Sequence, residues 1–157
     1  MRTDLKAGDI MTKSVLMAYE GWSIKRLSQF LIKNKVSGVP VIASDHSLVG
    51  VVTLSDVVKF ESKSHSEKCE LLSEVYSEFV GQQYDTDLQA QMMSKAGENC
   101  TVNQVMTKHV VQVDVDTSFQ EVAYVMLQNG IRRVFVTKNS VMCGVISGSN
   151  ILTAVAK

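Results

Sequence analysis

The sequence contains few of the residues on which disulfide-bonded or metal-bound domains depend. Its three cysteines, Cys69, Cys100 and Cys143, lie far apart and form no C-x-x-C pair. This argues against a disulfide framework or a zinc site and favours a reduced, cytoplasmic protein with structural thiols. No apolar run approaches the roughly 20 residues of a membrane-spanning helix. Residues 1–6 also lack the apolar core of a signal peptide.

The sequence also has no excess of positive or negative charge. The 157 residues carry 16 Lys and Arg against 16 Asp and Glu, which gives a formal net charge of zero. Broad binding to a phosphate backbone needs a basic face, so no nucleic-acid partner is expected. The three histidines, His46, His65 and His109, are scattered over ordinary polar positions. We see no metal-ligand spacing, Gly-rich phosphate loop or nucleophile–base arrangement, so the sequence predicts no catalytic residue and no metal site.

What the sequence does contain is a duplication. Met11-Thr12-Lys13 recurs as Met106-Thr107-Lys108, 95 residues later (106 minus 11). Partners at the same spacing are Val15 and Val110, Ser23 and Ser118, Asn34 and Asn129, Val39 and Val134, and Val41 and Val136. At Gly50 and Gly144 the spacing is 94, which places the loss of one residue in a hairpin turn. Two copies predict a pseudo-symmetric domain rather than a solenoid.

Each copy has the periodicity of a strand, a helix, two strands and a helix. In the first copy we expect a helical turn at 7–10, a strand at 15–18, a helix at about 22–34, a hairpin of 39–42 and 48–52, and a helix around Asp56. In the second copy we expect a strand at 110–113, a helix with a capping box at 117–120, a hairpin of 133–136 and 141–146, and a helix at about 149–156. Pro40 lacks an N–H, so we expect it at a strand start or edge.

The segment between the copies differs from both. Leu71, Leu72, Val75, Tyr76, Phe79 and Val80 recur at helical spacing, with Glu70, Glu74 and Glu78 on the other side. This pattern predicts that the helix after Asp56 continues, or restarts, through about Val80. A weaker helix is expected at 88–95. The apolar stripe either packs on the chain's own core or forms a dimer surface, and the sequence leaves both open.

One junction motif organises both copies. Gly50-Val51-Val52-Thr53-Leu54-Ser55-Asp56 returns as Gly144-Val145-Ile146-Ser147-Gly148-Ser149-Asn150. Each reads as a buried strand that runs into a helix, where a hydroxyl can cap the helix start and the residue three positions on can reach back. A lone motif of this kind is usually a cap only. Repetition within a longer unit makes it a candidate binding site as well.

These motifs together resemble the CBS domain pair, or Bateman module, over residues 7–60 and 102–155. The resemblance is carried by Met11-Thr12, Gly38-Val39-Pro40-Val41-Ile42 and the Gly50–Asp56 junction. It implies an α/β (α+β) fold of two pseudo-symmetric β-α-β-β-α repeats packed through their sheets. The first repeat would be residues 1–60, a helical linker 61–100, and the second repeat 101–157. It further implies a homodimer that binds adenine nucleotides or S-adenosylmethionine between the halves and regulates other proteins without chemistry of its own.

The resemblance also implies a ligand site. Asp56 would accept hydrogen bonds from both ribose hydroxyls, and Thr53 would bond the ribose or a phosphate oxygen. Ile10, Val15 and Val57 would flank the base. Arg132 and Arg133 suit phosphate oxygens, although surface arginines at a strand entry are nearly as good a reading. The complete predicted set is Thr12, Val39, Pro40, Val41, Thr53, Asp56, Arg132 and Arg133.

The second copy departs from the motif, so a weaker second site is expected at Thr107, Val134, Ser147 and Asn150. Asn150 replaces the aspartate and loses its charge, Gly148 stands where the first copy has Leu54, and Phe135 replaces the proline.

Three functions remain open. The leading hypothesis is a stand-alone regulatory module that senses AMP, ADP, ATP or a similar adenosine compound, with no tightly required cofactor. The alternatives are a ligand-free dimerisation or protein-interaction scaffold, and an S-adenosylmethionine binder. An enzyme is the least favoured class, and the sequence does not name the regulated protein.

Overall fold

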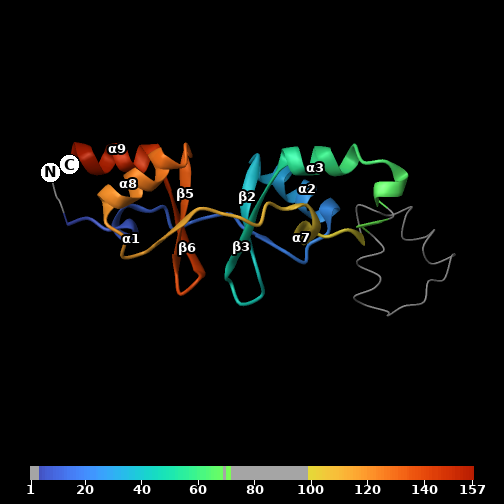
Figure 1. Ribbon diagram of the computed structural model, residues 1–157, viewed down its shortest axis with the longest axis horizontal. Coiled ribbons are helices and arrows are strands. Elements are labelled where there is room, and N and C mark those ends of the chain that lie inside the picture. The colour runs from blue at the N-terminus through green and yellow to red at the C-terminus, as the bar shows by residue number, and fades with distance from the viewer. Residues whose placement is uncertain (1–3, 69, 72–98) are drawn as a thin grey trace. The chain divides into compact units, whose positions relative to one another are not determined.

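The computed structural model describes residues 4–68, 70–71 and 99–157, and within them one order of elements occurs twice (Figure 1). The first series is α1 (Ala7–Ile10), β1 (Ala18–Tyr19), α2 (Ile24–Asn34), β2 (Gly38–Ile42), β3 (Leu48–Thr53) and α3 (Leu54–Glu61). The second is α7 (Val102–Val105), β4 (Gln112–Asp114), α8 (Phe119–Gln128), β5 (Arg133–Lys138), β6 (Val141–Ser147) and α9 (Gly148–Ala156). The duplication seen in the sequence is therefore a duplication of structure.

The long helices begin and end where local chemistry requires. The hydroxyl of Ser23 accepts from the Arg26 N–H at 3.1 Å, and Ser118 accepts from the Glu121 N–H at 3.3 Å. Each serine thereby satisfies a backbone donor that a helix start leaves unpaired. At the other end, α2 stops at Lys35 with φ 54°, and α8 is followed by Gly130 with φ 60°. Left-handed residues are common helix terminators.

Each series forms a three-stranded sheet, in the orders β1-β2-β3 and β4-β5-β6. In the second sheet, β4 runs parallel to β5, and β5 pairs with β6 in the antiparallel sense. The inward side chains of this sheet meet those of α1 and α8. The resulting core consists of Ala7, Val113, Val122, Met126, Val134, Val136 and Ile146. Alternation along the strands and helical spacing along α8 place these residues on one face of each element.

The chain divides into two compact units that do not follow the order of the sequence. Unit 1 comprises residues 1–17, 42–49 and 109–157, and unit 2 comprises residues 18–41 and 50–108. The segment before the first repeat, which we call the first lead-in (residues 4–17), thus belongs with the second sheet. The second lead-in (residues 99–108) belongs with the first. The two lead-ins are exchanged between the repeats.

Backbone hydrogen bonds fix each lead-in to the strand that carries the junction glycine. In unit 1, Thr12 and Val145 exchange two bonds, of 2.8 and 3.0 Å. In unit 2, Thr107 and Val51 exchange two bonds of 2.9 Å. The approach is so close that a Cβ on Gly144 would lie 2.8 Å from the Thr12 carbonyl oxygen, and one on Gly50 would lie 2.8 Å from that of Thr107. The close approach of the lead-in therefore requires glycine at this position of the motif, because any larger residue would place a Cβ against the lead-in backbone.

Some boundaries differ from those expected. The first strand is only Ala18–Tyr19, because Leu16 is exposed and lies outside the sheet. Pro40 lies in the middle of β2, the central strand, rather than at a start or edge. β1 has two residues against five in β2, so part of β2 has no partner on that side. The helix after Asp56 ends at Glu61, and helical residues resume at 65. The apolar stripe from Leu72 onward and the helix expected at 88–95 lie outside the described residues.

Candidate functional site

The two junctions share one capping arrangement. In unit 2, the Thr53 N–H donates to Asp56 Oδ2 at 2.8 Å, and the Thr53 hydroxyl donates to the same oxygen at 3.2 Å. In unit 1, the Ser147 N–H and hydroxyl donate to Asn150 Oδ1 at 2.8 and 2.7 Å. All four residues are half-buried. The capping boxes predicted at these two junctions are confirmed, and each strand passes directly into its helix. The box expected at 117–120 is wrong, because the cap of α8 is Ser118, which accepts from the Glu121 N–H.

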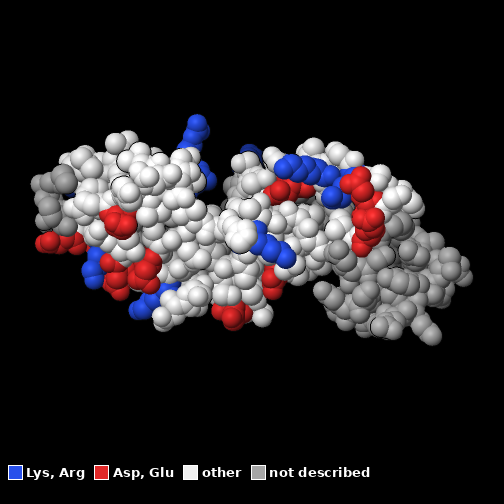
Figure 2. Space-filling model, viewed as in Figure 1, with Lys and Arg blue, Asp and Glu red and all other residues white. Residues whose placement is uncertain are grey.

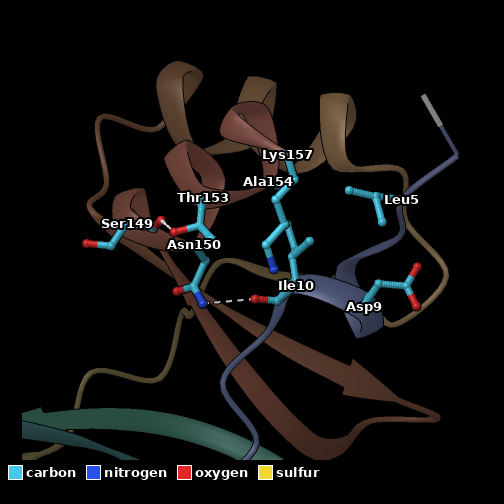
Figure 3. Close-up of a pocket in the computed structure, with 8 residues that line it drawn as sticks. All are labelled: Leu5, Asp9, Ile10, Ser149, Asn150, Thr153, Ala154 and Lys157. Atoms are coloured by element: carbon cyan, nitrogen blue, oxygen red, sulfur yellow. Dashed lines mark hydrogen bonds between the residues drawn. The ribbon is translucent and has the colours of Figure 1, made fainter. Parts of the chain in front are cut away.

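The junctions differ in the second terminal atom of the third helical residue, which is Asp56 in unit 2 and Asn150 in unit 1. Asn150 Nδ2 donates to the Ile10 carbonyl oxygen at 2.8 Å (Figure 3). It also donates to the Thr12 hydroxyl at 3.3 Å. Asp56 has an oxygen, Oδ1, in this place. No described residue donates a hydrogen bond to it. Asp56 therefore keeps a free acceptor beside a helix start, whereas Asn150 uses both ends of its amide within the chain.

A cavity of about 390 Å³ lies beside the Asn150 junction (Figure 3). Ile10 and Asn150 lie next to each other on one side of it, and Asp9 faces it from α1. Its remaining lining is Leu5, Ser149, Thr153, Ala154 and Lys157. This cavity could not be predicted from the sequence, because its walls come from α9 and from a lead-in that was expected to belong to the other repeat.

A second, larger hollow of about 720 Å³ lies in the same unit between α8 and α9. Arg132, Arg133 and Ser147 form its polar part, and Arg133 is the register partner of Ser147 in the β5–β6 pair. The apolar part includes Met126, Leu127, Ile131, Ile151 and Leu152. Both arginines are exposed, and neither forms an ion pair with another described residue. Their guanidinium groups are therefore available to an anion.

The structure distributes the predicted site residues over both units. Thr53 and Asp56 lie in unit 2, as do the three buried residues of β2, Val39, Pro40 and Val41. Thr107 is also in unit 2, beside Val51. Thr12, Arg132, Arg133, the buried Val134, Ser147 and Asn150 lie in unit 1. Hence Thr12 accompanies Asn150, and Thr107 accompanies the Asp56 junction, which is the reverse of the grouping expected from the sequence.

The remaining candidates for chemistry are cysteine thiols and metal-ligating side chains. Burial raises the pKa of the Cys100 thiol to about 11, so it stays protonated and unreactive at neutral pH. No set of three or more His, Cys, Asp or Glu side chains among residues 4–68, 70–71 and 99–157 is arranged to hold a metal ion. Within the same ranges, every helix is too short or too polar to cross a membrane. On the face shown in Figure 2, described acidic and basic side chains are interspersed and form no broad basic area.

Comparison with known proteins agrees with this architecture. The family profile named CBS domain matches residues 7–63 and 102–157. The chain is 27% identical over 150 residues to an uncharacterised protein of Methanocaldococcus jannaschii, and the match covers 93% of this chain and 88% of that protein. It is 25% identical over 150 residues to the chloroplastic CBS domain-containing protein CBSX1 of Arabidopsis thaliana, with 94% and 62% covered.

Enzymes match over only part of their length. Homoserine O-acetyltransferase of Methanococcus vannielii is 25% identical over 148 residues, and the match covers 94% of this chain but only 24% of that enzyme. The shared part is therefore about a quarter of the acetyltransferase.

Solved structures extend the likeness to the whole fold. CBSX2 from Arabidopsis thaliana superposes with a TM-score of 0.66 at 22% identity and covers 98% of this chain and 96% of that one. The structure of CBSX2 in complex with AMP gives a TM-score of 0.64 at 22% identity, with 97% and 96% covered. A CBS domain-containing protein of unknown function from Bacillus anthracis gives 0.67 at 15% identity, with 98% and 94% covered. At these identities the likeness establishes the fold alone.

Proposed function

Because this chain belongs to the CBS domain family and carries two tandem repeats, we propose that it is a regulatory module that binds an adenosine-containing ligand, such as AMP, ADP or ATP. One observation carries the proposal. Asp56 uses only Oδ2 in its helix cap, and no described residue donates a hydrogen bond to its Oδ1. A free carboxylate oxygen at a helix start is a strong acceptor for the hydroxyls of a ribose.

Two further features support the ligand class. The helix that starts after Thr53 directs backbone N–H groups outward, which favours an anionic group nearby. Arg132 and Arg133 are exposed and without ion-pair partners among the described residues, and the planar fork of arginine suits phosphate oxygens. The AMP complex of CBSX2 shows that a protein of this fold can hold such a ligand. In this proposal the backbone of Val39, Pro40 and Val41 reads the edge of the base.

A second candidate, a dimerisation scaffold without a ligand, is favoured by a different observation. Large apolar side chains are exposed at equivalent positions of the two repeats: Ile32 (73%) and Leu127 (79%), and Val58 (61%) and Leu152 (71%). They lie on α2 and α3 in unit 2 and on α8 and α9 in unit 1. Apolar positions repeated in this way are typical of an interface, so a homodimer is expected for either function.

Thermal unfolding separates the two candidates. The purified chain is heated with AMP, ADP, ATP, S-adenosylmethionine or adenosine, beside the variant Asp56→Ala. A ligand at about 100 times its dissociation constant stabilises the folded state by about 2.7 kcal/mol. A rise in melting temperature with an adenosine compound, absent in Asp56→Ala, supports the sensor. No rise with any of the five compounds would refute it and leave the scaffold.

A further inference from the structure

Asn150 makes contacts that a simple helix cap does not need. Its Oδ1 accepts from the Ser147 N–H and hydroxyl, and its Nδ2 donates to the Ile10 carbonyl and the Thr12 hydroxyl. The orientation of the amide is fixed by these partners. If the amide were turned over, Nδ2 would face the Ser147 N–H and Oδ1 would face the Ile10 carbonyl, which pairs donor with donor and acceptor with acceptor.

The contact joins residues 140 positions apart in the chain. Figure 3 shows it as the bond between the start of α9 and the end of α1. The pair of backbone bonds between Thr12 and Val145 also holds this part of the first lead-in, and bonds of Leu5, Ala7 and Gly8 hold the part before it. The second lead-in has the equivalent backbone pair at Thr107, but the carboxylate of Asp56 has no N–H to give. The amide donor is therefore a feature of unit 1.

We propose that Asn150 is a positioning residue that latches the first lead-in to the start of α9. The latch consists of the bonds from Asn150 Nδ2 to Ile10 and Thr12. In unit 1 the side-chain position that corresponds to the free Oδ1 of Asp56 is therefore occupied by an N–H group that is already bonded within the chain. If the proposed function holds, the latch also confines hydroxyl recognition to Asp56, because the unit 1 junction retains no free side-chain acceptor at this position.

Asn150→Asp removes the donor and keeps the cap, since a carboxylate accepts from Ser147 as Asp56 does from Thr53. Asp56→Asn is the matched control, because it also preserves the cap. Hydrogen exchange is followed in the ligand-free protein at the amides of Met11 and Thr12. At about pH 8 the introduced carboxylate faces the Ile10 carbonyl, and exchange in Asn150→Asp should be about tenfold faster than in the wild type, equivalent to about 1.4 kcal/mol. Asp56→Asn should not accelerate exchange at Met106 or Thr107.

A pH series distinguishes a latch from general loosening. Near pH 4.5 the introduced carboxyl takes up a proton, can donate to Ile10 again, and should restore most of the protection. The Ser147 N–H and hydroxyl lower the pKa of the introduced group, whereas the Ile10 carbonyl raises it. The latch predicts that the carbonyl has the larger effect in the folded state. Protonation then stabilises the fold, and the deficit grows as pH rises. The charged side chains of Asp9 and Lys157 also line this cavity, so every value is the difference from the wild type at the same pH.

Unchanged exchange in Asn150→Asp at pH 8 overturns the latch, and so does acceleration that persists undiminished at pH 4.5. If Asn150→Asp does not fold at pH 8, its unfolding is followed at pH 4.5. A cooperative unfolding transition there supports the latch. The latch is overturned if the variant shows no such transition at pH 4.5 while the wild type does. All of these measurements omit ligand. A failure to bind AMP would therefore refute the proposed function and leave this result untouched.

Discussion

Replacing Gly144 by alanine tests how the lead-in is held. The new Cβ would lie 2.7 Å from Met11 Sδ and 2.8 Å from the Thr12 carbonyl oxygen. The methionine side chain can move aside, but the backbone oxygen cannot do so freely. Any retreat of Thr12 lengthens its two bonds to Val145, which are 2.8 and 3.0 Å long.

The expected loss follows from these contacts. Overpacking a close site costs about 1–3 kcal/mol, and each weakened backbone bond adds up to about 1 kcal/mol. With two such bonds the loss is about 1–5 kcal/mol. For a chain of this size that lowers the melting temperature by roughly 2–20 °C.

The assay is thermal and urea unfolding followed by circular dichroism, with two comparison variants. Gly50→Ala meets the equivalent obstruction from Met106 and Thr107 and should lose a similar amount. Gly148→Ala, four residues along the same motif, meets nothing within 4 Å and should be neutral or stabilising by about 0.4–1 kcal/mol. The reasoning is refuted if Gly144→Ala melts within 1 °C of the wild type, or if Gly148→Ala is destabilised as much.

Three further predictions concern ligand and assembly. Asp56→Ala should weaken AMP binding by about 2 kcal/mol or more, roughly 30-fold, whereas Asn150→Ala should change it much less; calorimetry showing equal losses would contradict the ranking of the two junctions. Arg132→Ala and Arg133→Ala should weaken AMP binding while leaving adenosine binding almost unchanged, and lysine at either position should rescue only in part. Equal weakening of adenosine and AMP in a titration would mean that the arginines hold the strand entry instead. Light scattering at micromolar concentration should give the mass of a homodimer, and a monomeric mass would exclude it.

The sequence was sufficient to predict the repeat and the helix caps at the two junctions. The spacing between Met11 and Met106 revealed the repeat, and the hydroxyl and Asp or Asn of each junction predicted the caps at Thr53 and Ser147 that the structure contains. These features need only the chemistry of neighbouring residues.

What depends on the tertiary path of the chain could not be predicted in the same way. Nothing in the lead-in sequences indicates which sheet they join, since Thr12 and Thr107 are equally suited to either. The second role of Asn150 was missed for that reason. Its loss of charge is visible in the sequence, but the Ile10 carbonyl that receives its N–H is 140 residues away.

The exchange of lead-ins has a consequence for how the protein is made. The core of unit 1 includes Ala7 together with residues of β4, α8, β5 and β6, and its backbone bonds join Ala7 to Thr117 and Leu5 to Phe119. On the ribosome, the first lead-in must therefore wait until more than a hundred further residues have emerged before it finds its place. Contacts of such long range slow folding. A recombinant fragment that begins at residue 102 would lack Ala7 and leave a gap in the core of unit 1. Because each unit contains parts of both repeats, a cut at the boundary between the repeats divides both units.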